Sequence, residues 1–172
     1  MKLSLRAKTV LLAVKPQIWK AAAEQYAPRL AEDAVIVSIA AGVSAADIAR
    51  GRDVLRALSP FDIGQAAVVI DGHVVGVEDI EGTDGLLARV ARLRAEGRIR
   101  AKPARGVLVK APKSGQDLRF DLPTMGPRTV EGAALAQLAG IAIVAGNTIV
   151  VEPQAMIEAA DAAGLFVTGL PA

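Results

Sequence analysis

The 172-residue sequence contains no cysteine and a single histidine, His73. The absence of cysteine excludes disulfides, thiolate metal ligands and a cysteine nucleophile, and it agrees with a reducing compartment. One histidine makes a histidine-based metal or catalytic cluster improbable. We therefore expect any catalytic chemistry to depend on carboxylates, lysines, arginines and hydroxyl groups.

Aromatic residues are also scarce, at 3%, although hydrophobic residues make up 52% of the chain. A core built from Ala, Val, Leu and Ile is typical of helices packed on an apolar sheet. The lack of aromatic residues among basic ones disfavours nucleic-acid binding, because bases stack on aromatic rings. No apolar run is long enough to span a bilayer, and residues 1–8 lack the apolar region of a secretory signal. We expect a cytoplasmic protein.

The net charge is only +2, but basic residues crowd into one segment. Residues 89 to 113 include one acidic residue, Glu96, and nine basic residues: Arg89, Arg92, Arg94, Arg98, Arg100, Lys102, Arg105, Lys110 and Lys113. Such a segment attracts anions such as phosphorylated small molecules or lipid headgroups. It fits equally well a solvated helix end followed by a basic loop.

Residues 1–51 have the pattern of a βαβ unit. Apolar runs at 9–14 and 34–40 predict buried strands, and a helix beginning at Pro16 would lie between them. Ser44 would cap a short helix that continues to about Arg50.

The segments Leu-Leu-Ala-Val-Lys-Pro-Gln (11–17) and Val-Ser-Ile-Ala-Ala-Gly-Val-Ser (37–44) resemble the nucleotide-binding domain of pyrroline-5-carboxylate reductase. The resemblance implies that an NADP site would be bordered by Ala13, Lys15, Pro16, Gln17, Ala40 and Gly42. However, residues 1–51 lack the Gly-x-Gly-x-x-Gly turn that holds the pyrophosphate. We therefore interpret this segment as a structural remnant without a cofactor site, and we do not expect NADP-dependent reduction.

From Arg52 onward the pattern alternates between strands and helices. Asp71-Gly72 predicts a hairpin over 65–77, and Thr83 or Asp84 would cap a helix over 85–96. Further strands are predicted at 107–109, 141–145, 148–151 and 165–168, and helices at 129–139, ended by Gly140, and 153–163. The apolar residues Leu135, Leu138, Ile141 and Phe166 are expected in the core. The fold class is therefore α/β, a mixed sheet with flanking helices, preceded by a partial Rossmann-like βαβ unit. We place the domains at 1–51 and 52–172.

Polar chemistry is densest between residues 106 and 131. After an apolar strand come Lys110 and Lys113, and the alternation at 117–122 would place Asp117, Arg119 and Asp121 on one face of a strand. Pro123 would stop that strand, and Gly126-Pro127 is typical of a helix start. Lysines and carboxylates beside a helix N-terminus suit a phosphate ester with a divalent metal. Alternating charges also suit a plain solvated strand face.

The same segment carries a second resemblance. It is joined by the segments 61–66, 77–84, 138–141 and 159–167, and together they resemble the C-terminal domain of LpxI-type UDP-2,3-diacylglucosamine diphosphatases. The longest matching motif is Gly-Val-Leu-Val-Lys-Ala-Pro-Lys-Ser-Gly-Gln-Asp-Leu-Arg-Phe-Asp-Leu-Pro-Thr-Met-Gly-Pro (106–127). The resemblance implies hydrolysis of UDP-2,3-diacylglucosamine to UMP and 2,3-diacylglucosamine 1-phosphate in lipid A biosynthesis, with Mg²⁺ or Mn²⁺ as cofactor.

Roles for individual residues follow from that implied reaction. Asp121 is the expected catalytic carboxylate, as a metal ligand or as the group that orients water, and Glu81 is a second expected metal ligand. Asp117 would assist Asp121, unless it only pairs with Arg119. Phosphate contacts are expected from Lys110, Lys113 and Arg119, and hydrogen bonds to the diphosphate from Gln116 and Thr124, although the last two could equally satisfy turn amides.

An alternative function is a non-catalytic module that binds a phosphate ligand or a lipid headgroup with the same residues. Residues 1–51 do not resemble the N-terminal domain of LpxI-type enzymes, so turnover could be impaired. The expected partners are a UDP-sugar lipid and, by peripheral contact, a membrane surface. An exposed strand edge in the first 51 residues could also drive homodimer formation.

Overall fold

A computed structural model describes residues 9–12, 35–38, 45–113 and 122–171. The chain forms two compact units, Met1–Ala41 and Gly42–Ala172. The domain limits that we inferred from the two resemblances stay a prediction.

In the first unit, β1 (Thr9–Leu12) and β2 (Val35–Ser38) pair in parallel. Both strands were predicted. Parallel pairing is the arrangement that a βαβ unit requires, because the chain must cross over between the two strands. The helix predicted from Pro16 lies outside the described residues.

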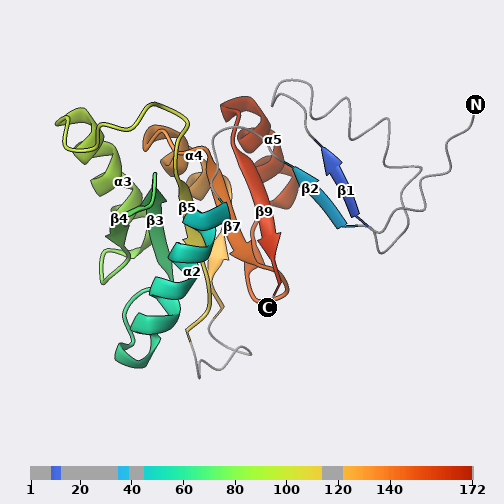
Figure 1. Ribbon diagram of the computed structural model, residues 1–172, viewed down its shortest axis with the longest axis horizontal. Coiled ribbons are helices and arrows are strands. Elements are labelled where there is room, and N and C mark those ends of the chain that lie inside the picture. The colour runs from blue at the N-terminus through green and yellow to red at the C-terminus, as the bar shows by residue number, and fades with distance from the viewer. Residues whose placement is uncertain (1–8, 13–34, 39–44, 114–121, 172) are drawn as a thin grey trace, which may run out of the picture. The chain divides into compact units, whose positions relative to one another are not determined.

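The second unit is built on a five-stranded mixed sheet in the order β4-β3-β5-β7-β9 (Figure 1). The strands are β3 (Ala66–Ile70), β4 (His73–Val77), β5 (Val107–Lys110), β7 (Gly140–Val144) and β9 (Phe166–Leu170). β5, β7 and β9 are parallel, whereas β3 is antiparallel to both β4 and β5. This confirms the predicted mixed sheet.

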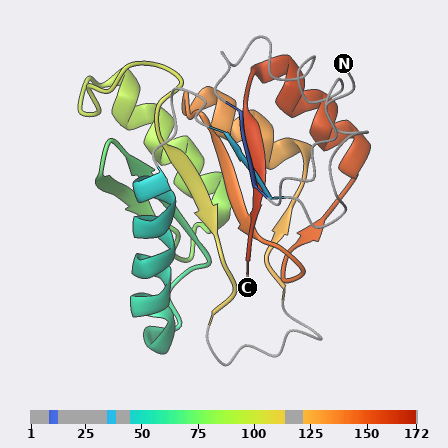
Figure 2. The same cartoon turned by 45° about the vertical axis from the view of Figure 1, so that its right-hand side comes forward.

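Helices cover both faces of this sheet (Figures 1 and 2). On one face, α2 (Ala45–Leu58) packs Leu55 against Ala67, Val107 and Val109. On the other face, Val68 and Leu108 join α3 (Gly82–Ala95), α4 (Pro127–Leu135) and α5 (Pro153–Ala163) in the larger core cluster. Successive strand residues therefore serve opposite helix layers, which explains why these strands read as continuous apolar runs.

α2 differs from its prediction in length. It begins at Ala45, close to the expected start, but continues to Leu58 instead of ending near Arg50. Gly51 lies inside this helix. An added Cβ there would overlap the Val109 side chain, so glycine allows the helix to lie close to the sheet. Asp47, in the first turn, accepts a hydrogen bond from the Gly72 amide at 2.8 Å and so ties the helix to the predicted hairpin turn.

α4 ends earlier than predicted. The last helical residue is Leu135, and Gly140 begins β7 instead of ending the helix. Gln137 takes the left-handed conformation (φ 52°), and the amide of Leu138 donates to the Ala133 carbonyl. This is the Schellman ending usually supplied by glycine, so the residue type concealed it. Leu135, expected in the core, is 75% exposed, whereas Leu138 and Ile141 are buried as predicted.

A short element was missed by the sequence analysis. β6 (Thr124–Met125) pairs in parallel with β8 (Ile149–Val150). The strand predicted over 148–151 therefore exists, but its partner lies directly after Pro123. Gly126 then precedes α4 with Pro127 at its first position, as predicted. Within the described residues, no helix is long and apolar enough to cross a membrane.

The central strand should dominate stability. Leu108 is fully buried in the middle of the sheet. Leu108→Ala should lower the free energy of unfolding by about 2–5 kcal/mol because it leaves a cavity between the sheet and three helices. The matched substitution Leu135→Ala should change it by less than about 0.5 kcal/mol. Urea denaturation of both variants measures the two values, and similar losses would contradict the burial described here.

Candidate functional site

The ends of three strands meet at one edge of the second unit. Lys110 ends β5 and lies opposite Ala66, the first residue of β3, while Val77 ends β4 opposite Ala67. The loops that precede β3 and follow β4 are therefore neighbours. The carboxyl ends of parallel strands are where α/β proteins usually bind ligands.

Lys110 is the most buried charged side chain at this edge, with 4% of the residue exposed. Its ammonium group donates to the Thr83 hydroxyl and to the Thr124 carbonyl oxygen, both at 2.8 Å. Thr83 in turn donates its hydroxyl hydrogen to Oε2 of Glu78 at 2.5 Å. The predicted position of Lys110 at the end of a buried strand is confirmed. Its predicted contact with a phosphate is not tested and stays a prediction.

Burial has a direct effect on this lysine. It lowers the pKa of the Lys110 ammonium below its ordinary value, because the charged form loses its hydration. The negative charges of Glu78 and Asp84 oppose this shift. Since these carboxylates and two hydrogen bonds stabilise the ammonium, a charge is tolerated at this buried position.

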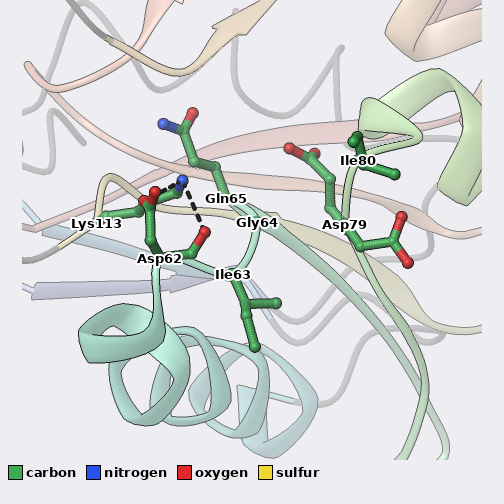
Figure 3. Close-up of a pocket in the computed structure, with 8 residues that line it drawn as sticks. Asp62, Ile63, Gly64, Gln65, Asp79, Ile80 and Lys113 are labelled. Atoms are coloured by element: carbon green, nitrogen blue, oxygen red, sulfur yellow. Dashed lines mark hydrogen bonds and ion pairs between the residues drawn. The ribbon is translucent and has the colours of Figure 1, made fainter.

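A pocket of about 550 Å³ opens beside this network. Its lining residues come from three segments, and they are Asp62, Ile63, Gly64, Gln65, Glu78, Asp79, Ile80 and Lys113. Figure 3 shows Lys113 directed at Asp62, with Gln65 beside them and Asp79 and Ile80 approaching from the other loop. The size and the mixed polar and apolar lining suit a small polar ligand.

Lys113 reaches the pocket from the segment after β5. Its ammonium donates to Oδ1 of Asp62 at 2.6 Å and to the Asp62 carbonyl oxygen at 3.2 Å. Three carboxylates and one lysine line the pocket, so its formal charge is negative. A phosphate bound there would therefore need additional positive charge to be stabilised.

Glu81, the predicted metal ligand, pairs with Arg89. Nε and Nη2 of Arg89 donate to Oε1 of Glu81 at 2.9 and 2.5 Å, and Arg89 also donates to the Val77 carbonyl. The predicted caps are wrong: α3 begins at Gly82, and neither Thr83 nor Asp84 precedes it. The Thr83 hydroxyl instead belongs to the Lys110 network, and Asp84 pairs with Arg128 at 2.8 Å.

Thr124 joins the site through its backbone. Its carbonyl oxygen accepts from Lys110, whereas its hydroxyl donates to the Leu122 carbonyl at 3.3 Å. The hydroxyl therefore satisfies a local turn in this structure, and its predicted bond to a diphosphate is untested. Four other predicted site residues lie outside the described residues, namely Gln116, Asp117, Arg119 and Asp121.

The described residues do not by themselves supply a metal site. Among them, no three His, Asp or Glu side chains gather into a group that could hold an ion. Glu81 is engaged by Arg89, and Asp121, the other predicted metal ligand, is among the undescribed residues. The described residues alone therefore do not complete the predicted metal site, whose other expected ligand is Asp121.

Sequence reasoning missed Asp62, Glu78 and the role of Thr83. A signal was present in Asp62-Ile-Gly-Gln, because Gly64 has a positive φ of 48° and a Cβ there would overlap the Glu78 carbonyl oxygen. A glycine required by close approach marks two loops that touch. The motif alone does not reveal that the loop touching Gly64 is the one that contains Glu78.

The second unit is thus an α/β sheet with lysines and carboxylates beside the end of β5, and such strand ends are where α/β proteins usually bind ligands. Within that class, the chain belongs to the LpxI C-terminal domain family, whose model matches residues 35–168. This match also covers residues 35–51, part of the segment that resembles pyrroline-5-carboxylate reductase. The resemblance to pyrroline-5-carboxylate reductase stays a prediction.

The chain is also similar to a curated relative. It is 52% identical over 125 residues to a protein of Caulobacter vibrioides named UDP-2,3-diacylglucosamine pyrophosphatase LpxI. The similarity covers 73% of this chain and 45% of the relative. The chain therefore spans less than half of the length of the relative that it matches.

The lowered pKa of Lys110 has a consequence for stability. Between that pKa and the ordinary value of 10.5, the unfolded state binds more protons than the folded state, so the free energy of unfolding rises with pH. Below the lowered pKa both states are protonated and this contribution is constant. Urea denaturation between pH 8 and about 11 should show a rise for the natural chain relative to Lys110→Met. Parallel curves for the two proteins would contradict the burial of a charged Lys110.

Proposed function

We propose that this chain hydrolyses the pyrophosphate bond of UDP-2,3-diacylglucosamine, giving UMP and 2,3-diacylglucosamine 1-phosphate. The observation that carries the proposal is the 52% identity to the Caulobacter protein, whose name gives this substrate and activity. The site agrees with it, because lysines and carboxylates share the pocket edge. A hydrolase of this kind takes part in lipid A biosynthesis.

The protein must position a water molecule, take a proton from it and neutralise charge on the phosphoryl oxygens. A water oxygen bonds to one phosphorus while the bond from that phosphorus to the bridging oxygen breaks, and the bridging oxygen leaves with the other phosphate. The water loses a proton, a step that we assign to Asp121 with Asp117 as its partner. Lys113, already at the pocket, would neutralise phosphoryl charge, and Arg119 and Gln116 would add contacts.

Mg²⁺ or Mn²⁺ is proposed as the cofactor, with Asp121 and Glu81 as its ligands. When bound, the ion would supply positive charge to the diphosphate. The negative formal charge of the pocket lining supports a cation requirement, since one lysine does not offset three carboxylates. Glu81 would have to exchange its bond with Arg89 for the ion.

Contact with a membrane surface is proposed through the apolar side chains at the pocket edge. Phe61 is 72% exposed, and Ile63 and Ile80 line the pocket itself. Exposed apolar residues beside a polar pocket suit an amphiphilic substrate presented at a bilayer. A cytoplasmic location and a homodimer remain part of the proposal.

The second candidate is a binding module for a phosphate ligand or lipid headgroup. It requires only polar groups that the described residues already place at the pocket, Lys113 among them. The two candidates share their residues and differ in whether a water molecule is activated.

Hydrolysis of UDP-2,3-diacylglucosamine by the purified chain, with Mg²⁺ or Mn²⁺, separates these functions. We expect UMP release that EDTA abolishes and that Asp121→Ala lowers by about a hundredfold or more, because the carboxylate that relieves water of its proton is lost. Asp53→Ala, which removes an exposed carboxylate from α2, serves as the matched control and should keep its activity. Binding of the substrate without release of UMP would contradict the diphosphatase and support the binding module.

A further inference from the structure

The Thr83 hydroxyl lies between two charged groups that belong to different segments. It accepts a hydrogen bond from the Lys110 ammonium at 2.8 Å and donates one to Glu78 Oε2 at 2.5 Å. A hydroxyl has one hydrogen to donate and lone pairs to accept, so this arrangement uses it in both directions. Lys110 and Glu78 are therefore connected through Thr83.

The three residues come from three parts of the fold. Glu78 follows β4, Thr83 lies in the first turn of α3, and Lys110 ends β5. The second hydrogen bond of Lys110 reaches the Thr124 carbonyl, at the start of β6. One hydroxyl and one ammonium thus fix the relative positions of four segments at the carboxyl end of β5.

Only one member of this chain of hydrogen bonds lines the pocket. The described lining includes Glu78 but neither Thr83 nor Lys110. Thr83 therefore acts on the pocket through the Glu78 carboxylate, one of whose oxygens it holds. The Lys110 ammonium is surrounded by Thr83, the Thr124 carbonyl and the charges of Glu78 and Asp84. Its charge is stabilised by the protein itself before any phosphate binds.

We propose that Thr83 is a positioning residue of this site, which orients the Glu78 carboxylate in the pocket and holds the Lys110 ammonium against the Thr124 carbonyl. Lys110 then serves catalysis by holding β6 and α3 in place. The catalytic consequence rests on the proposed diphosphatase function, whereas the hydrogen-bonded connection does not.

The first test is the comparison of Thr83→Val with Thr83→Ser in the UMP-release assay. Valine keeps the shape and removes both hydrogen bonds, whereas serine keeps the hydroxyl. We expect Thr83→Val to lower kcat about tenfold or more with a smaller change in KM, as for other residues that orient active groups, and Thr83→Ser to restore most of it. The matched control is Thr168→Val on β9, which is the edge strand opposite β4, and it should keep its kcat.

The interaction between Thr83 and Lys110 gives a second kinetic criterion. If both residues act through one network, Thr83→Val combined with Lys110→Met should lose less than the product of the single losses. If Lys110 instead contacts the phosphate directly, Lys110→Met should raise KM and the two effects should multiply. Multiplying effects, or an unchanged kcat in Thr83→Val, would overturn the proposal.

The connection is also measured without catalysis. The Cε resonance of Lys110, followed by ¹³C NMR as pH is raised, reports the midpoint of its titration. Glu78→Gln should lower that midpoint, because the negative charge that favours the ammonium is removed, whereas Asp53→Asn should leave it unchanged. An unchanged midpoint in Glu78→Gln would overturn the connection. If the chain releases no UMP but shows this shift, the proposed function is refuted and the connection between Lys110 and Glu78 stands. If Thr83→Val fails to fold, the NMR measurement still tests that connection.

Discussion

The site depends on the burial of one positive charge. Removing an ammonium group from water is costly, and the cost is offset only where hydrogen-bond acceptors and negative charges surround it. At Lys110 the acceptors are the Thr83 hydroxyl and the Thr124 carbonyl, and the negative charges are Glu78 and Asp84. Each acceptor belongs to another segment. The same interactions that make the charge tolerable therefore fix the start of α3 and the start of β6 relative to β5.

The mixed sheet explains why these segments meet. Because β3 is antiparallel to β5 and β4 is antiparallel to β3, the start of β3 and the end of β4 lie at the same edge as the end of β5. The loops 62–65 and 78–80 consequently line one pocket, and Lys113 enters it from the segment after β5. The family to which the chain belongs is defined over this same region. The proposed diphosphatase chemistry thus uses an edge whose geometry the buried lysine holds in place.

Patterns of apolar residues and turn signals sufficed for most of the elements. The Asp71-Gly72 turn, the pattern at 153–163 and the apolar run 107–109 predicted a hairpin, a helix and a strand that the structure contains. The errors have physical causes: Gln137 ended α4 in a conformation that usually signals glycine, and α2 was predicted too short although Gly51 lets it continue close to the sheet. Lys110 was placed correctly at a strand end, but its partners could not be foreseen, because hydrogen bonds between distant segments leave no periodic trace. Thr83 was predicted to cap a helix because its hydrogen bonds to Lys110 and Glu78 likewise join distant segments.

The central claim is that Lys110 is buried and hydrogen-bonded in the native protein, in contrast to Lys102, which is exposed in the loop before β5. Brief labelling with acetic anhydride, read by mass spectrometry of the digested chain, measures this difference directly. The account predicts that Lys102 is acetylated quickly in the native protein, that Lys110 is protected, and that both react alike in urea. Equal labelling of Lys110 and Lys102 in the native protein would contradict it.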